Sequence, residues 1–144
     1  MKVVMVLLSL WLTLYGNIYA APSKEENNLQ DKCSKGAEEF FKHKFGTGLE
    51  KDSKLVRSRS YTYNYNKKLD KCFILISIYG YPKDNTQGDT VNILLYDINE
   101  NKELGSLFEA NSERPRSDCI FLNKPAVKCS REEWNSFVKP YIQE

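Results

Sequence analysis

The sequence predicts an α+β fold: an antiparallel meander of four to five strands with an N-terminal and a C-terminal helix. Three observations lead to this prediction. Apolar residues recur at helical spacing over residues 29–45, two segments between residues 57 and 79 have strand patterns, and a capped helical pattern ends the chain. Four cysteines behind an apolar N-terminal segment add the expectation of two disulfides.

Residues 1–20 are typical of a signal peptide. Lys2 supplies a positive charge, an apolar segment follows, and small residues come at the end, where we expect cleavage after Ala20. The apolar segment is too short and interrupted to cross a bilayer core of ~30 Å, so a retained membrane anchor is the less favoured alternative. We therefore expect no transmembrane segment after cleavage, a flexible lead-in over residues 21–28 and a single domain over residues 29–144.

The charge balance disfavours two classes of partner. The chain has 21 basic and 19 acidic residues, and removal of Lys2 with the signal peptide leaves 20 and 19, a net charge near +1. Such a balance does not steer a whole molecule toward nucleic acid or anionic lipid, and we expect no nucleic-acid partner. The signal peptide and the even number of cysteines together predict a secreted or periplasmic protein.

The first helix is expected over residues 28–44. Its apolar stripe consists of Leu29, Cys33, Ala37, Phe40, Phe41 and Phe45. Gly46 and Gly48 follow and are expected to end the helix. The last helix should start after Ser130, which forms a capping-box pattern with Glu133, and Pro140 should end or kink it near Lys139.

Two adjacent segments predict the first hairpin of the sheet. Residues 57–66 alternate strictly, which is typical of a half-buried strand, and residues 71–79 are the most apolar part of the mature chain and predict the central strand. A turn should occupy residues 67–70. The remaining strands are expected at residues 91–98, 103–109 and 118–122, separated by a polar 80–90 loop, a turn at 99–102 and a 111–117 loop.

Four cysteines allow three pairings. The Cys119–Cys129 bond closes a short strand-to-helix connection, so it is the easiest pairing to form, and it leaves Cys33 to pair with Cys72. A zinc site is a less favoured alternative, because the sequence has no Cys-x-x-Cys pair and one histidine only.

The second disulfide would tie the first helix to the central strand and thereby select the buried face. Side chains alternate along a strand, so Cys72, Ile74 and Ile76 should face the helix. If Tyr65 lies opposite Cys72, then Tyr61 and Tyr63 face the helix as well. A register change of one residue would reverse this assignment.

The candidate binding surface consists of Lys67, Lys68, Lys71, Phe73, Leu75 and Tyr79. The three lysines lie at or beside the tip of the first hairpin and could contact an acidic partner or an envelope glycan. The other three residues belong to the sheet face opposite the first helix, where aromatic and polar side chains mix. Two alternatives remain open for that face: it is covered by the 80–90 loop, or by a second copy of the chain in a homodimer.

No catalytic constellation is visible. His43 is the single histidine and has no identifiable partner, and no serine lies in a nucleophile-elbow pattern. The oxygen-rich segment 84–89 lacks the acidic spacing of an EF-hand loop, so a polar turn is favoured over a calcium site. We therefore expect no enzymatic activity, no cofactor and no metal.

Residues 33–42 (CSKGAEEFFK) and 65–76 (YNKKLDKCFILI) resemble a group of small, uncharacterised exported or lipid-anchored bacterial proteins. The likeness extends to the Cys119…Cys129 pair and the closing Trp-containing helix, and so covers most of the mature chain. It implies a periplasmic or extracellular location, and it transfers no functional residue. The chain differs from the lipid-anchored members in having no cysteine at the cleavage site.

These observations together predict a non-enzymatic binding or interaction protein of the bacterial envelope, whose ligand the sequence does not identify. The alternative is a secreted inhibitor or effector that acts through the 80–90 and 111–117 loops. This alternative rests on analogy with other small disulfide-braced modules.

Overall fold

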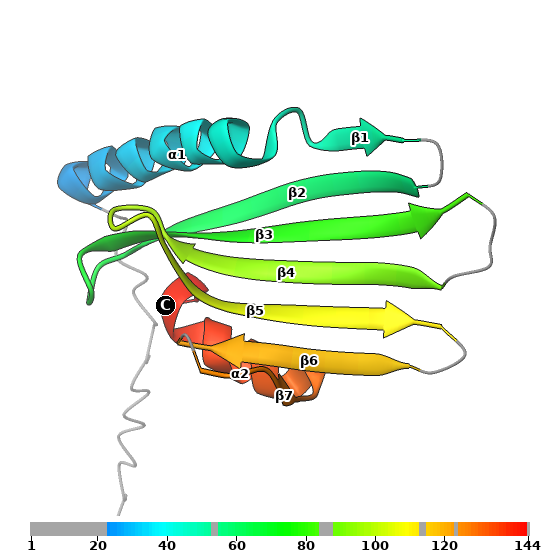
Figure 1. Cartoon of the computed structure of the whole chain (residues 1–144). Helices are drawn as coiled ribbons and strands as arrows, with labels where there is room; N and C mark the ends of the chain where they lie inside the picture. The colour runs from blue at the N-terminus through cyan, green and yellow to red at the C-terminus, as the bar shows by residue number, and fades with distance from the viewer. Residues whose placement is uncertain (1–22, 53–54, 84–87, 113–114, 123, 144) are drawn as a thin grey trace, which may run out of the picture.

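The computed structural model describes residues 23–52, 55–83, 88–112, 115–122 and 124–143. In these residues the chain forms a seven-stranded antiparallel sheet and two helices (Figure 1). Each strand pairs with its neighbour in sequence, so the sheet is a simple meander. The elements are α1 (Lys24–Phe45), β1 (Leu49–Lys51), β2 (Leu55–Asn66), β3 (Lys71–Pro82), β4 (Asp89–Asp97), β5 (Lys102–Asn111), β6 (Arg116–Phe121), β7 (Val127–Lys128) and α2 (Arg131–Ile142). The predicted signal peptide lies outside the described residues.

The predicted architecture is confirmed in its main features, and the strand number is higher than expected. The five expected strands appear as β2 to β6, and β1 and β7 are added at the two edges. These two strands contain only three and two residues. An alternating pattern needs about four residues to be visible in a sequence, which explains why both were missed.

Helix α1 begins at Lys24 rather than at residue 28. Ser23 is its N-cap, and the Ser23 hydroxyl accepts a hydrogen bond from the backbone N–H of Glu26. Acidic side chains lie in the first turn and basic ones in the last, as the helix dipole favours. The expected flexible lead-in is therefore wrong for residues 24–28, which are helical. Gly46, with φ of 70°, ends the helix.

One face of the sheet packs against α1. Its core combines Ala37 and Phe41 of the helix with Ile74, Ile76 and Tyr96 of the sheet. The predicted register holds, because Tyr65 lies opposite Cys72, Tyr63 opposite Ile74 and Tyr61 opposite Ile76. Tyr61 therefore reaches the helix, where its ring centroid lies 4.6 Å from that of Phe41. The Cys33–Cys72 disulfide joins the same two layers, as expected.

The other face packs against α2. Trp134 and Val138 of this helix join a core that contains Phe73, Leu95 and Leu107. The helix starts as predicted, with a capping box between Ser130 and Glu133, but it continues through Pro140 to Ile142. Its C-terminal end is held by β2, because the side-chain amides of Asn64 and Asn66 donate hydrogen bonds to the carbonyls of Tyr141 (3.2 Å) and Pro140 (2.8 Å).

Candidate binding groove

The lysines expected to form a basic hairpin tip are largely paired within the protein. Lys67 forms an ion pair with Glu26. Lys71 donates a hydrogen bond to Asp97, whose carboxylate is almost fully buried 2.7 Å away, and a second to Glu100. The bond to Asp97, followed by that to Glu100, raises the pKa of Lys71 above its usual value. Lys68 is exposed at the tip, beside an acidic residue, Asp70. The tip therefore carries much less net positive charge than the lysine count suggests.

Helix α2 covers two of the three apolar residues of the expected surface and leaves the third, Tyr79, exposed. Phe73 lies under the helix and is only 1% exposed, and Leu75 packs against the same core. These two residues therefore do not form an open face, because the amphipathic α2 packs over them. Tyr79, further along β3, lies beyond the helix and is 36% exposed.

Tyr79 lines an open groove at the end of the sheet where β3 and β5 end and β4 and β6 begin. These strand ends lie on the right of Figure 1. The groove has a volume of about 540 Å³, within the range of roughly 300–1,000 Å³ that is common for ligand sites. Its lining residues come from four neighbouring strands and the adjoining connection: Tyr79, Tyr81, Asp89, Thr90, Val91, Glu109, Ala110, Asn111, Pro115, Arg116 and Ser117.

The strand register explains why these side chains meet. Tyr79 lies opposite Val91, Val91 opposite Glu109, and Glu109 opposite Ser117, so one row of side chains crosses four strands. Residues directly opposite one another in an antiparallel sheet have their Cβ atoms about 5 Å apart, so the row is continuous. It forms the floor of the groove.

A second row lies one step closer to the strand ends. Asp89 is opposite Asn111, and both share their sheet face with the first row because side chains alternate. Tyr81 follows Tyr79 at the same alternation on β3. Tyr79 and Tyr81 have ring centroids 6.5 Å apart and an interplanar angle of 12°. Both rings are exposed, Tyr81 to 43%. Two nearly parallel tyrosines thus stand next to a carboxylate and an amide.

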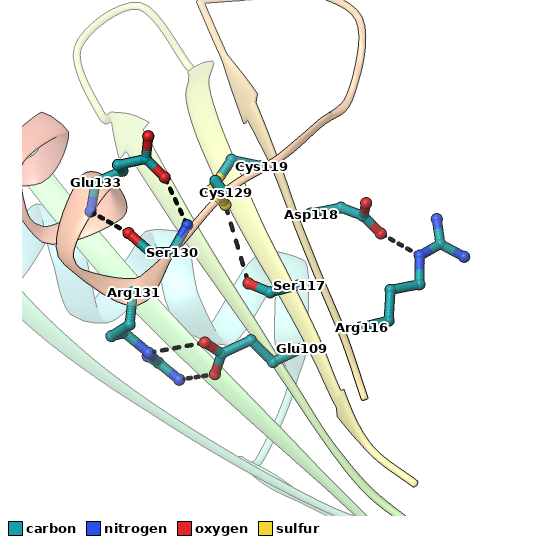
Figure 2. The surroundings of a disulfide bond; sticks show 9 residues. All are labelled: Glu109, Arg116, Ser117, Asp118, Cys119, Cys129, Ser130, Arg131 and Glu133. Atoms are coloured by element: carbon teal, nitrogen blue, oxygen red, sulfur yellow. Dashed lines mark hydrogen bonds and ion pairs between the residues drawn. A yellow bond between two sulfur atoms is a disulfide. The ribbon is translucent and has the colours of Figure 1, made fainter. Parts of the chain in front are cut away.

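The wall on the α2 side of the groove is rigidly braced (Figure 2). Arg131, the first residue of α2, contacts both carboxylate oxygens of Glu109, one of them at 3.2 Å. Two residues before it, Cys129 forms the predicted disulfide with Cys119 of β6. The Ser117 hydroxyl lies 4.0 Å from the Cys129 sulfur. The helix start, the disulfide and two floor residues therefore form one connected unit.

Gly88 allows a close backbone approach at the outer end of the groove. A Cβ atom on Gly88 would lie 1.4 Å from the carbonyl oxygen of Asn111. Only glycine fits this position, because any side chain would collide with the β5 backbone. The sequence showed Gly88 as part of a turn-rich loop, and residues 84–87 of the oxygen-rich segment, for which a polar turn was favoured over a calcium site, lie outside the described residues.

Sequence reasoning found part of this site. It named Tyr79 and, separately, both loops whose described ends line the groove, but it did not connect them. Tyr81, Asp89 and Asn111 were missed as site residues. The Tyr-x-Tyr spacing at the end of β3 was the available signal, because residues two apart on a strand share a face.

No protein-family model matches this chain, and comparisons with curated proteins and with solved structures find no significant match. The interpretation of the groove therefore depends on its own chemistry. Within the described part of the chain, neither helix combines the length and the apolar character needed to cross a membrane. Among the same residues, no group of three or more His, Cys, Asp or Glu side chains is placed to hold a metal ion.

Proposed function

We propose that this chain is an exported, non-enzymatic binding protein of the bacterial envelope, and that it holds its ligand in the groove lined by Tyr79 and Tyr81. The observation that carries this proposal is the pair of exposed, nearly parallel tyrosine rings beside the polar side chains of Asp89 and Asn111. Tyrosines are frequent in binding sites, because they offer a large contact area and a polar group while losing little conformational entropy.

The rigidity of the groove supports binding rather than a structural role for these rings. The floor lies on paired strands, and its α2 side is fixed by the Arg131–Glu109 contact and by the Cys119–Cys129 disulfide. A site that is already ordered loses little entropy when a ligand binds. Neither tyrosine belongs to either packed core, so core packing does not account for them.

The chemistry of the lining residues favours binding over catalysis. General acid–base catalysis needs a titratable group that is free to exchange a proton with a substrate. The Glu109 carboxylate is engaged on both oxygens by Arg131, and Arg116 is engaged by Asp118. Among the described lining residues, Asp89 then has no second free carboxylate with which to divide acid and base roles.

A secreted inhibitor or effector is the second candidate function. The described ends of the 80–90 and 111–117 loops, which this hypothesis requires, lie around one groove instead of at separate places on the surface. Hairpin ends that project side by side from a rigid sheet are suited to insertion into a partner's cleft.

Retention on a purified envelope fraction tests the proposed function. We expect the secreted protein to be retained, and the double variant Tyr79→Ala/Tyr81→Ala to be released. Phe108→Ala is the matched control, because Phe108 is 37% exposed on β5 but faces the opposite side of the sheet from Glu109. Equal retention of all three proteins would refute binding through the groove, and so would the release of all three.

Replacement of residues 83–88 by a short Gly-Ser linker separates the two candidates. An inhibitor should lose its activity with this loop. An envelope-binding protein that uses the sheet face should keep its retention, since both tyrosines remain in place.

A further inference from the structure

We propose that the ligand of the groove is a neutral oligosaccharide whose sugar rings stack on Tyr79 and Tyr81. This inference rests on the proposed function, because it assigns a ligand class to the same groove. Three features of the described residues lead to it: the aromatic platform, the polar groups beside it, and the charge of the lining.

The platform suits a pyranose ring. One face of such a ring presents several C–H bonds, whose hydrogens carry partial positive charge, and an aromatic face carries negative charge density. The two tyrosine rings are nearly parallel, with centroids 6.5 Å apart, and both are exposed, so each can offer an aromatic face to a sugar ring. A chain of linked sugars can contact both rings at once, whereas a monosaccharide contacts only one.

The polar groups suit hydroxyls. Each sugar hydroxyl both donates and accepts hydrogen bonds, so a site for sugars must supply acceptors and donors close together. Asp89 supplies acceptors and Asn111 supplies both, and the two lie opposite each other next to the tyrosine pair. Ser117, in the row of side chains that includes Tyr79, adds a hydroxyl group to the same face. This density of hydrogen-bonding groups exceeds what an apolar ligand requires.

The charge of the lining disfavours anionic ligands. Arg116 is paired with Asp118, and Arg131, beside the groove, is paired with Glu109. Among the described residues no basic side chain pairs with Asp89, so its exposed carboxylate would repel a phosphate or a carboxylate. A neutral ligand meets no such penalty.

A proline-rich peptide is the competing occupant, because extended polyproline segments dock into aromatic-lined grooves. That mode uses the aromatic rings and few polar groups, and it leaves the adjacent Asp89 and Asn111 without a role. Addition of a peptide strand is not available here, because the groove lies on the face of the sheet and not along an edge.

A glycan microarray of neutral hexopyranose oligosaccharides, followed by titration calorimetry with the hexasaccharide bound best, tests the inference. We expect binding by the secreted protein, with a dissociation constant raised at least tenfold in Tyr79→Ala and in Tyr81→Ala. We expect a smaller loss in Asp89→Asn and none in the Phe108→Ala control. The fluorescence of Trp134, which is buried in the α2 core, checks that each variant is folded.

The possible results separate this inference from the proposed function. If no glycan binds but the tyrosine variants are released from the envelope fraction, the oligosaccharide is refuted and the binding function stands. If deca-proline binds instead and requires the same tyrosines, the ligand is a peptide and the inference is wrong. If a glycan binds equally well to the tyrosine variants, the groove is not its site, and the inference is likewise overturned.

Discussion

Replacement of Phe73 by alanine tests the assignment of the two sheet faces. Phe73 is 1% exposed and lies in the core beneath α2, where its ring meets that of Tyr141 edge-on at a centroid distance of 5.1 Å. Truncation of a buried phenylalanine removes its burial energy and leaves a cavity, which together cost about 3–5 kcal/mol. Such a loss is a large part of the stability of about 5–15 kcal/mol that is usual for a domain.

Phe108→Ala provides the matched comparison, because the same side chain is removed from an open face. Phe108 is 37% exposed, so its truncation removes less buried apolar area than truncation of Phe73, and it leaves no enclosed cavity. We expect a loss of roughly 1–2 kcal/mol. The two variants should therefore differ by about 1–4 kcal/mol, with Phe73→Ala the less stable.

Urea denaturation followed by tryptophan fluorescence measures the difference. Trp134 is the sole tryptophan after the predicted signal cleavage and shares the core of Phe73, so its emission reports the α2 layer. With a denaturant slope of roughly 2 kcal/mol per molar urea, a loss of 4 kcal/mol moves the midpoint by about 2 M. Equal midpoints for the two variants would mean that α2 does not cover Phe73, and the placement of the groove beyond that helix would fail with it.

Three further outcomes are expected. Ser130→Ala removes the N-cap of α2 and should cost about 1 kcal/mol in the same denaturation experiment. Opening the Cys33–Cys72 bond, which spans 39 residues, by alanine replacement of both cysteines should cost about 4 kcal/mol in the loop-entropy model. Burial, together with the hydrogen bond to Glu103, raises the pKa of Tyr96 from 10.0 to about 12. The folded state therefore holds this proton more tightly, so the associated stability is present below pH 10 and is lost between pH 10 and 12. Tyr96→Phe should flatten that decline in urea midpoints measured against pH.

The hairpin of β2 and β3 could be predicted from the sequence almost residue by residue. Strict alternation over residues 57–66 and a four-residue turn leave few registers, and the one that places Tyr65 opposite Cys72 is found. The Cys119–Cys129 pairing and the capping box at Ser130 also involve residues close in sequence, and both predictions are confirmed. Features determined by residues close in sequence were thus accessible.

The burial of Phe73 had a sequence signal that was not used. Residues 71–79 are apolar on both alternating faces, which is typical of a strand covered on two sides. The last helix has an apolar stripe with Trp134 and Val138 that also requires a partner. These two facts together predict that α2 covers the face opposite α1. The start of α1 had a weaker signal, because its first turn contains no apolar residue and only the cap at Ser23 marks it.

The groove depends on pairings that a single sequence does not determine. Asp89 meets Asn111 only in the register of β4 with β5, and this register shifts at a bulge between Leu95 and Tyr96. A bulge moves every later pair by one residue, so alternation alone gives the wrong partners. Tyr79 was visible as an exposed aromatic residue, whereas its neighbours across the sheet were not.

The position of α2 explains why the groove stays open. The helix starts beside β5, where Arg131 contacts Glu109, and ends at β2, where Asn64 and Asn66 hold its last turn. It therefore runs away from the strand ends that carry Tyr81 and Asn111. The Cys119–Cys129 bond prevents a shift of the helix start toward those ends, because it fixes the residue before the N-cap to β6. The Cys119–Cys129 disulfide, which stabilises the core beneath α2, thus also keeps α2 away from the tyrosines and leaves the groove accessible.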